Sequence, residues 1–303
     1  MSKPAARVLC VGVAVQDNIF SIEQFPVEPT KVFARDFRQV GGGPAANGAV
    51  TIARLGGKAS LWARVGDDQV GQGIVAELAS YGVDTASIRH VPNRRSAVSS
   101  VMVDSRGERF IFAFADRNLD TDTGWLPADL PTGTDAVLCD VRWPDASEKV
   151  MHLARGRGIP VVLDADLTTD NSVQRLIPHA THAVFSAPAL RRLTDQTDIE
   201  EGLRRAQALT SGVVAVTLGA DGFAWLDGGR KRTVPAFTIE AIDTLAAGDV
   251  FHGAFALGLA ESLSVEGAGR FASAAAGLKC TRWGGRAGIP TREELDKFMA
   301  QAA

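Results

Sequence analysis

The sequence contains few cysteines and no long apolar run. Its three cysteines, Cys10, Cys139 and Cys280, lie far apart, and none has a neighbour at the spacing of a metal site. A sparse, odd set of cysteines is typical of a reducing compartment, so we expect a cytoplasmic protein. No apolar run reaches membrane-spanning length and no signal-peptide core is visible, so we expect no membrane partner.

The sequence also lacks an excess of either charge. Lys and Arg total 32 and Asp and Glu total 35, which gives a net charge of −3. Nucleic acids and anionic membranes bind strongly basic surfaces. Neither is therefore expected as an obligate partner. The 303 residues are enough to bury a large core.

What the sequence does contain is a long alternation of strand-like and helix-like segments. This pattern predicts a doubly wound, mostly parallel α/β sheet with helices on both faces. An apolar first strand is expected at residues 8–15. Later strands are expected at 59–65, 135–140, 160–164, 181–185 and 212–218, with a hairpin at 223–227 and 231–236. Helices are expected at 44–55, 69–81, 146–157, 189–195, 199–210, 248–261, 265–281 and 291–300.

Two β-like regions, at about 17–40 and 96–115, do not fit this alternation. In both, apolar side chains alternate with polar ones, as in half-exposed strands. We therefore predict one domain over residues 1–303 that carries a small β-sheet lid. The apolar face of such a lid needs a cover, either a ligand or a second subunit. A two-fold homodimer formed through the lid is the expected assembly.

Polar residues follow several of the expected strands. In an open α/β sheet, ligands bind beyond the carboxyl ends of the strands. Asp17 follows the first strand, although it could be only a turn residue. The later strand ends carry Asp140 with Arg142, Asp164 with Asp166, Ser186, and Thr217 with Gly219. This repetition predicts a single ligand crevice.

The most informative stretch is residues 242–256. Its small residues Ala246, Ala247 and Gly248 precede a helix-forming run, so they are expected to form a helix N-terminus that suits an anionic phosphate. Asp249 would then lie in the first helical turn. A carboxylate there can take a proton from a substrate hydroxyl as the hydroxyl attacks phosphorus. The alternative is a tight turn into a core helix.

Residues 41–49 form a second glycine-rich stretch that brings backbone close to a ligand. No Lys-Ser/Thr follows it, so it is not a Walker A loop. Together, the two stretches resemble the two signatures of the ribokinase-like sugar kinases, the PfkB family. The first matches at Gly42, Gly43, Asn47, Ala49, Gly56 and Gly66, and the second matches from Asp243 to Ala254.

The resemblance implies roles for individual residues. It implies that Asp249 is the catalytic base and that Ala246, Ala247 and Gly248 form the anion hole. It places Asp17, Gly42, Gly43 and Asn47 against the sugar. Residues 217–222 resemble the nucleotide turn of the family, and residues 273–277 correspond to the region beside adenine. This implies nucleotide contacts at Thr217, Gly219, Gly222 and Ser273.

One feature of the family is missing. Many members carry Asn-x-x-Glu after the strand equivalent to 181–185, where it helps to hold magnesium and phosphate. This chain has Ser186-Ala187-Pro188-Ala189. The resemblance still implies ATP and Mg²⁺ as cofactors and allows a monovalent cation. Asp164, Asp166 and Asp243 are the carboxylates available for a metal.

Within the family, three stretches are most similar to sulfofructose kinases. They are residues 40–46, residues 140–143, and residues 278–290 without 283. This similarity implies that Lys31 and Arg142 touch a sulfonate, because an arginine can bond two of its oxygens at once. Ala113 departs from it, since a polar contact is expected there.

The predicted function is ATP-dependent phosphorylation of a primary sugar hydroxyl, with 6-deoxy-6-sulfofructose as the first candidate and its 1-phosphate as product. Another ketose, a sugar acid or a nucleoside is an alternative acceptor. An alternative of another class is a catalytically silent sugar-binding regulator.

Overall fold

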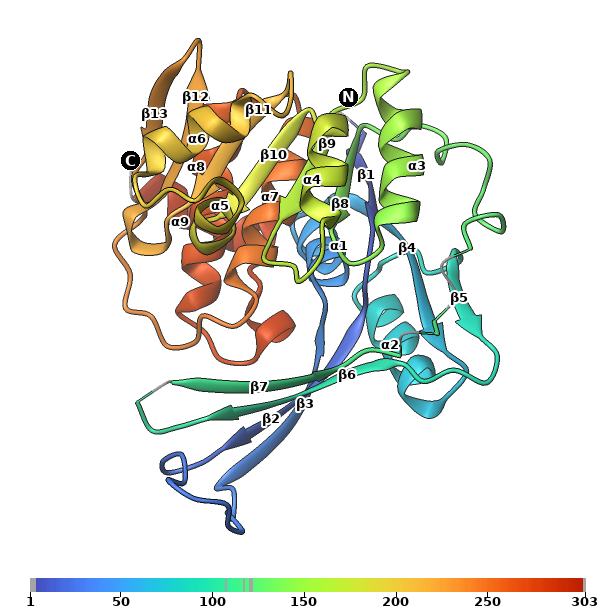
Figure 1. Ribbon diagram of the computed structural model, residues 1–303, viewed down its shortest axis with the longest axis vertical. Helices are drawn as coiled ribbons and strands as arrows, with labels where there is room; N and C mark the ends of the chain where they lie inside the picture. The colour runs from blue at the N-terminus through green and yellow to red at the C-terminus, as the bar shows by residue number, and fades with distance from the viewer. Residues whose placement is uncertain (1–3, 107, 117, 120–121, 302–303) are drawn as a thin grey trace.

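The computed structural model describes residues 4–301 except 107, 117, 120 and 121. A large sheet has the strand order β13-β12-β11-β10-β9-β8-β1-β4-β5 and forms the body of the molecule (Figure 1). All pairs are parallel except those that β12 makes with its two neighbours. The strands are β1 (Arg7–Val11), β4 (Lys58–Gly66), β5 (Ile88–Val91), β8 (Ala136–Asp140), β9 (Val161–Ala165), β10 (His182–Ser186), β11 (Val213–Thr217), β12 (Phe223–Asp227) and β13 (Arg230–Val234).

Helices cover both faces of this sheet. One buried core lies between the sheet and α1 (Pro44–Arg54), α2 (Gln69–Ser80), α7 (Ala247–Ala260), α8 (Val265–Cys280) and α9 (Arg292–Gln301). The other lies under α3 (Pro144–Arg155), α4 (Ser172–Leu176), α5 (Ala187–Thr194) and α6 (Ile199–Gln207). Short 3₁₀ turns are η1 (Ile177–His179), η2 (Gly219–Asp221) and η3 (Gly285–Gly288). The predicted doubly wound fold is thus confirmed. Within the described part of the chain, no helix is long and apolar enough to cross a membrane.

The lid is a second, four-stranded sheet with the order β3-β2-β6-β7, which extends from one end of the body (Figure 1). It consists of β2 (Val15–Ser21), β3 (Asp36–Gly42), β6 (Ala97–Val103) and β7 (Arg109–Phe114). The two central strands β2 and β6 are parallel, and the outer strands are antiparallel to them. A row of Phe37, Phe20, Met102 and Phe110 crosses all four strands on one face. Phe37 and Phe110 are 50% and 54% exposed, so this outer face is an uncovered apolar surface.

The prediction of one strand over residues 8–15 is wrong. β1 ends at Val11, and the lid strand β2 begins at Val15. Between them, Gly12 passes so close to the carboxylate of Asp140 that a Cβ would lie 2.1 Å from it. The amide of Val13 donates to the same carboxylate over 2.9 Å. Asp17 therefore lies within the lid and does not end a body strand. Strand β5 and helix α4 were not predicted.

Candidate active site

The start of α7 forms a cradle of small residues beside a cavity. Ala246 precedes the helix in the left-handed conformation, with φ of 61°, which is uncommon for a residue that has a Cβ atom. Ala247 and Gly248 then begin the helix and face a cavity. The first N–H groups of a helix have no intrahelical partner, and the helix dipole adds positive potential there. The three residues proposed as the anion hole thus occupy a suitable position.

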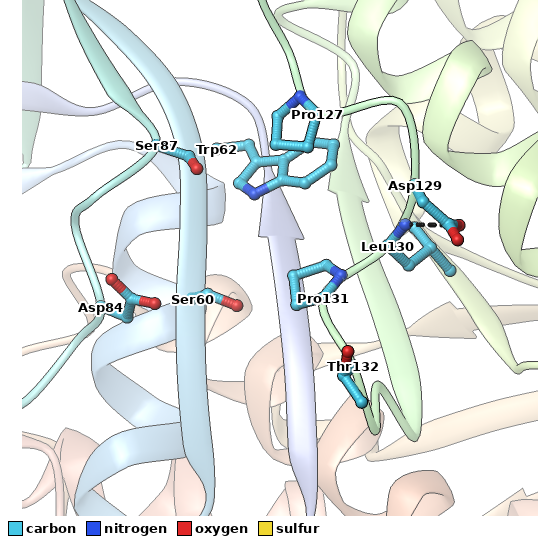
Figure 2. Close-up of a pocket in the computed structure, with 9 residues that line it drawn as sticks. All are labelled: Ser60, Trp62, Asp84, Ser87, Pro127, Asp129, Leu130, Pro131 and Thr132. Carbon is cyan, nitrogen blue, oxygen red and sulfur yellow. Dashed lines mark hydrogen bonds between the residues drawn. The ribbon is translucent and has the colours of Figure 1, made fainter.

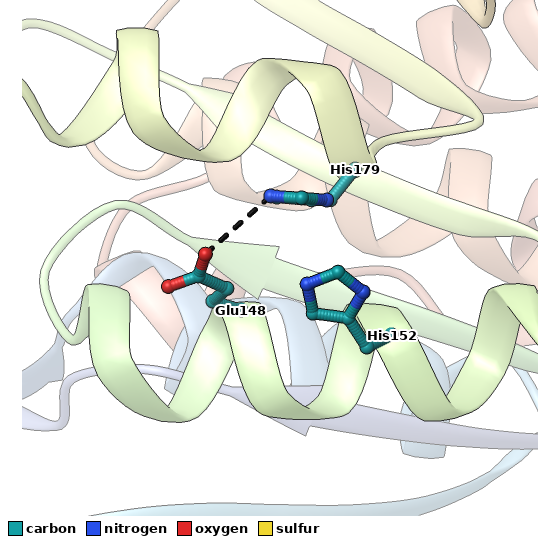
Figure 3. A group of neighbouring side chains, drawn as sticks. All are labelled: Glu148, His152 and His179. Atoms are coloured by element: carbon teal, nitrogen blue, oxygen red, sulfur yellow. Dashed lines mark ion pairs between the residues drawn. The ribbon is translucent and has the colours of Figure 1, made fainter.

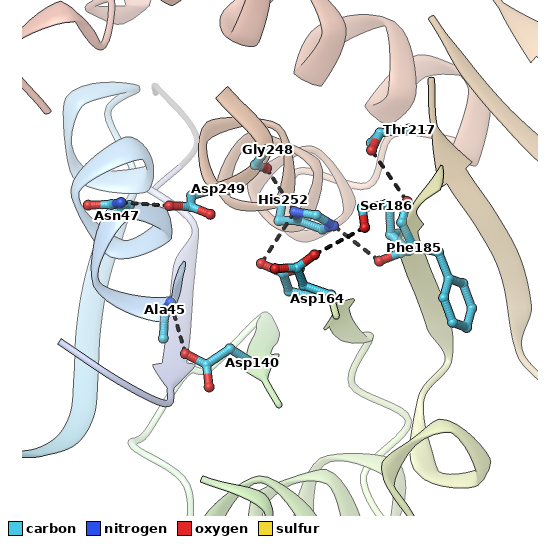
Figure 4. A network of polar contacts seen from close by, with 12 residues as sticks. Ala45, Asn47, Asp140, Asp164, Phe185, Ser186, Thr217, Gly248, Asp249 and His252 are labelled. Carbon is cyan, nitrogen blue, oxygen red and sulfur yellow. Dashed lines mark hydrogen bonds and ion pairs between the residues drawn. The ribbon is translucent and has the colours of Figure 1, made fainter. Parts of the chain in front are cut away.

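Asp249 lies in the first turn of α7 and is half-buried. Its Oδ2 accepts a hydrogen bond of 2.6 Å from Nδ2 of Asn47 on α1 (Figure 4). Burial, together with the nearby charge of Asp164, raises the pKa of Asp249 to about 7. A carboxylate that titrates near neutral pH suits the role of general base. Asn47 itself is only 3% exposed.

The glycine-rich turn before α1 makes room for protein side chains as well as for a ligand. A Cβ on Gly42 would lie 2.1 Å from Oδ2 of Asp17, so the carboxylate of Asp17 rests against this glycine. Asp17 also accepts a 2.6 Å hydrogen bond from Ser99 on β6. Gly43 caps α1 with a φ of 94°, a conformation that favours glycine. The structure thus brings Asp17, Gly42, Gly43 and Asn47 to the junction of lid and body.

Of the carboxylates at the strand ends, some are held by protein groups and one is accessible to a ligand. Asp140, 1% exposed, accepts from the backbone of Val13, Ala45 and Arg142 and therefore holds the start of α1 in place. Asp164, 4% exposed, lies 3.4 Å from the imidazole of His252. Burial raises the pKa of Asp164 and lowers that of His252.

Asp166 is the more accessible carboxylate at the end of β9, with a side chain 41% exposed. It accepts a 3.0 Å hydrogen bond from Ser186, which also caps α5. The guanidinium of Arg142 lies 3.5 Å from its other oxygen. Arg142 thus lies at the carboxyl end of β8, as predicted. Lys31 lies in the loop between β2 and β3 and is exposed, so the structure does not bring it to these strand ends.

The predicted nucleotide residues line one cavity of about 550 Å³. Thr217, Gly219, Gly222 and Ser273 face it, together with Ala247 and Gly248 of the anion hole. Ser273 is 9% exposed, and its Oγ has no hydrogen-bond partner among the described residues. A buried hydroxyl without a partner is costly, so it favours a polar ligand in this cavity. The cavity therefore fits a nucleotide whose phosphates reach the start of α7.

Asp243 does not fit as a metal ligand. Its Oδ2 lies 3.3 Å from the ammonium of Lys279, which is 0% exposed, and the same ammonium donates to the Asp243 carbonyl over 2.8 Å. Its carboxylate also accepts from the backbone of Leu245 and Gly284. This pair fixes the loop that leads into the anion hole. Asp243 was a metal candidate from the sequence, where its lysine partner 36 residues away was not recognised.

Two buried cations of the site were missed from the sequence, Lys279 and Arg286. Arg286 is 1% exposed and its guanidinium contacts Glu77, Asn47 and the Gly42 carbonyl. Both residues lie in a segment of small and apolar residues, where a charge needs a specific partner. A charged residue among small and apolar ones was the signal that could have found these two side chains. Their partners could not be identified, because they are more than 30 residues away in sequence.

Two other features lie elsewhere. A cavity of about 260 Å³ lies between β4 and the loop 127–132 (Figure 2). Asp84 and Asp129 line it, and Asp129 is paired with Arg157. Glu148, His152 and His179 form the one group of three potential metal ligands found among the described residues (Figure 3). His152 lies in the last turn of α3, whereas the first turn of this helix follows the carboxyl end of β8. Glu148 is already paired with Arg175.

Known proteins resemble the chain over nearly its whole length. A family model described as pfkB family carbohydrate kinase matches residues 5–292. The chain is 30% identical over 298 residues to the ribokinase of Bacillus subtilis (strain 168), covering 97% of this chain and 100% of that protein. A crystal structure of a putative ribokinase from Agrobacterium tumefaciens superposes with a TM-score of 0.94 at 41% identity and covers 98% of each chain. The ribokinase of Arabidopsis thaliana complexed with ribose and ATP gives 0.83 at 26% identity, covering 97% of this chain and 99% of that one.

Proposed function

The chain belongs to the pfkB family of carbohydrate kinases, and on that basis we propose that it transfers the γ-phosphoryl group of ATP to a primary hydroxyl of a sugar. The observation that carries the proposal is the position of Asp249. Its carboxylate lies in the first turn of α7, next to the cradle of Ala247 and Gly248 that opens into the nucleotide cavity. Base and phosphate site are thus one residue apart.

In the proposed reaction, Asp249 accepts the proton of the sugar hydroxyl as that oxygen attacks the γ-phosphorus. The bond from phosphorus to the β,γ-bridging oxygen breaks, and ADP leaves. The N–H groups at the start of α7 stabilise the charge on the transferred group. Mg²⁺ on the phosphates would neutralise part of their negative charge. Of the three candidate carboxylates, Asp164 is held by the buried imidazole of His252 and Asp243 by the buried ammonium of Lys279. Asp166 has no buried partner of either kind among the described residues. Asp166 therefore fits a metal held through water.

We further propose a single kinase domain over residues 1–303, with the lid at about 17–40 and 96–115, and a cytoplasmic location. An ADP-release assay across ketoses, sugar acids and nucleosides tests the activity, and no turnover with any of them would favour a silent sugar-binding protein.

For the acceptor sugar, we propose 6-deoxy-6-sulfofructose as the first candidate, phosphorylated at its 1-hydroxyl. Arg142 at the end of β8 supports an anionic group on the sugar, because a guanidinium can bond two sulfonate oxygens. Ala113 lies in register with Ser99, which is itself in register with Asp17. It therefore leaves space on the sugar-facing side of the lid instead of a polar contact. Another ketose, a sugar acid and a nucleoside remain the alternative acceptors.

Replacing Arg142 with alanine is expected to separate these substrates. If Arg142 pairs with a sulfonate, kcat/KM for sulfofructose should fall by about 10²-fold, as expected for loss of a charge-assisted contact of 2–3 kcal/mol. The value for fructose should change little. Steady-state kinetics on both sugars give the answer, with exposed Arg230 changed to alanine as the control. Equal losses on both sugars, or a wild type that prefers fructose, would reject the sulfonated substrate.

We also propose a two-fold dimer that covers the outer face of the lid. The row formed by Phe37, Phe20, Met102 and Phe110 gives the lid an exposed apolar face, and patches of this kind mark interfaces, which in homo-oligomers are most often two-fold. Light scattering at micromolar concentration should give twice the chain mass of 32.0 kDa. Phe110→Glu should return the mass to that of one chain. A wild-type monomer would contradict this assembly.

A further inference from the structure

Arg286 is a buried cation near the catalytic carboxylate, and its contacts cross three parts of the fold. It lies on η3, and its Nη1 donates to Glu77 of α2 over 2.8 Å. Its Nη2 donates to the Gly42 carbonyl over 2.9 Å, and its Nε donates to Oδ1 of Asn47 over 2.8 Å. A Cβ on Gly41 would lie 1.8 Å from this guanidinium. Gly41 is therefore a glycine because Arg286 fills the adjacent space.

The contact with Asn47 fixes the orientation of an amide. A side-chain amide has one oxygen that accepts and one nitrogen that donates. Because Nε–H of Arg286 can only donate, it holds Oδ1 of Asn47 on its own side and turns Nδ2 towards Asp249. Nδ2 then donates to Oδ2 of Asp249 over 2.6 Å. Oδ1 of Asp249 has no hydrogen bond from the described residues, which leaves it for a substrate hydroxyl.

Arg286 also supplies the positive charge for a group of carboxylates. The titratable groups that act on Asp249 are Asp164 and Asp166 of the β9 end, His252 of its own helix, and Arg286 of η3. Glu77, Tyr81 and Asp17 act electrostatically on Arg286 in turn. Two carboxylates beside Asp249 favour its protonated form. Arg286 is the one permanent cation in this set, because Lys279 is bound to Asp243.

We propose that Arg286 is a positioning residue of the phosphoryl transfer, which acts through Asn47 to select the Asp249 oxygen that faces the sugar and to keep that carboxylate ionised. The proposal rests on the assignment of Asp249 as the base. Glu77 also takes part, because its negative charge partly offsets that of Arg286 and so weakens the stabilisation of the Asp249 carboxylate by Arg286. If Arg286 had only a structural role, replacing it would not shift the pH dependence of kcat.

The test uses Arg286→Gln, Arg286→Lys and Glu77→Gln in the full-length enzyme, with kcat and kcat/KM measured between pH 5 and 9. A base must be deprotonated, so activity rises with pH through the pKa of Asp249, which is about 7. Loss of the cation in Arg286→Gln should lower kcat by about 10²-fold through misplacement of the base. It should also move the acid limb of the profile upward by about one pH unit. KM for ATP should not change.

Glu77→Gln should move the acid limb in the opposite direction, because an uncompensated Arg286 stabilises the Asp249 carboxylate more strongly. Arg286→Lys keeps the charge but loses the planar contact, so kcat should fall without the upward shift. If Arg286→Gln does not fold, Glu77→Gln decides alone, since its side chain is 33% exposed. A Glu77→Gln profile that is unshifted or moves upward overturns the proposal. Full activity of Asp249→Asn would instead reject the proposed base.

Discussion

Asp249→Asn is expected to lower kcat by roughly 10²–10⁴-fold, the usual contribution of general base catalysis. The substitution keeps the size of the side chain and removes only its ability to accept a proton. Oδ1 of the asparagine can still accept the hydrogen bond that Asn47 donates to Oδ2 of the aspartate. The geometry of the site should therefore persist, and KM for ATP should stay close to wild type. Steady-state kinetics and calorimetric titration with ATP measure the two quantities.

The pH dependence of the wild type gives an independent check on this role. Burial and the charge of Asp164 raise the pKa of Asp249 to about 7, so kcat should fall as the pH drops through this value. Residual activity of Asp249→Asn should not show this limb. A variant with near wild-type kcat, or one that keeps the same limb, would mean that another group is the base. Glu240→Gln, at an exposed position before the anion-hole loop, serves as the control.

Much of the body could be predicted from the sequence because its signals are local. The expected helix at 44–55 is α1 (Pro44–Arg54), and the expected strand at 160–164 is β9 (Val161–Ala165), each within one residue at both ends. Buried parallel strands are continuous apolar runs, and helix starts carry proline or capping residues. The change of direction at Gly12 was missed because Val13, Ala14 and Val15 continue the apolar run. What turns the chain there is the carboxylate of Asp140, more than 120 residues away.

The candidate site shows the same limit. The motif around Asp249 was visible because it is contiguous in sequence. The side chains that hold it come from distant segments: Asn47 lies 202 residues away, and Arg286 contacts Asn47 across 239 residues. Such pairs leave no local pattern in one sequence. Ser99 was missed for the same reason, since only the strand register places it beside Asp17.

Lys279→Met is expected to lower the free energy of unfolding by about 3–5 kcal/mol, the usual effect of removing one partner of a buried ion pair. The ammonium of Lys279 is fully buried and lies against both the carboxylate and the carbonyl of Asp243. Methionine has a similar length but no charge, so the Asp243 carboxylate would remain buried without its counter-charge. Urea unfolding at neutral pH measures the difference from wild type.

The pH dependence of this difference is also fixed by the structure. Burial alone would raise the pKa of Asp243, but hydrogen bonds from Leu245, the charge of Lys279 and the amides of Gly284 and Gly285 outweigh it, so the pKa is lowered. A group with a lowered folded-state pKa stabilises the fold above its ordinary value of 3.8 and loses that contribution as the pH falls through the folded value. The gap between wild type and Lys279→Met should therefore be widest near neutral pH and shrink below pH 3.8.

The loss of stability should be accompanied by a loss of activity, because Asp243 also binds the backbone of Leu245 and Gly284. Those contacts hold the loop before the anion hole and the turn that carries Arg286. Adding Asp243→Asn to Lys279→Met removes the unpaired charge and should restore part of the stability, which a double-mutant cycle quantifies. Lys297→Met breaks an exposed pair with Glu293 and should change little. A Lys279→Met protein as stable as the Lys297→Met control would show that the buried pair does not hold this loop.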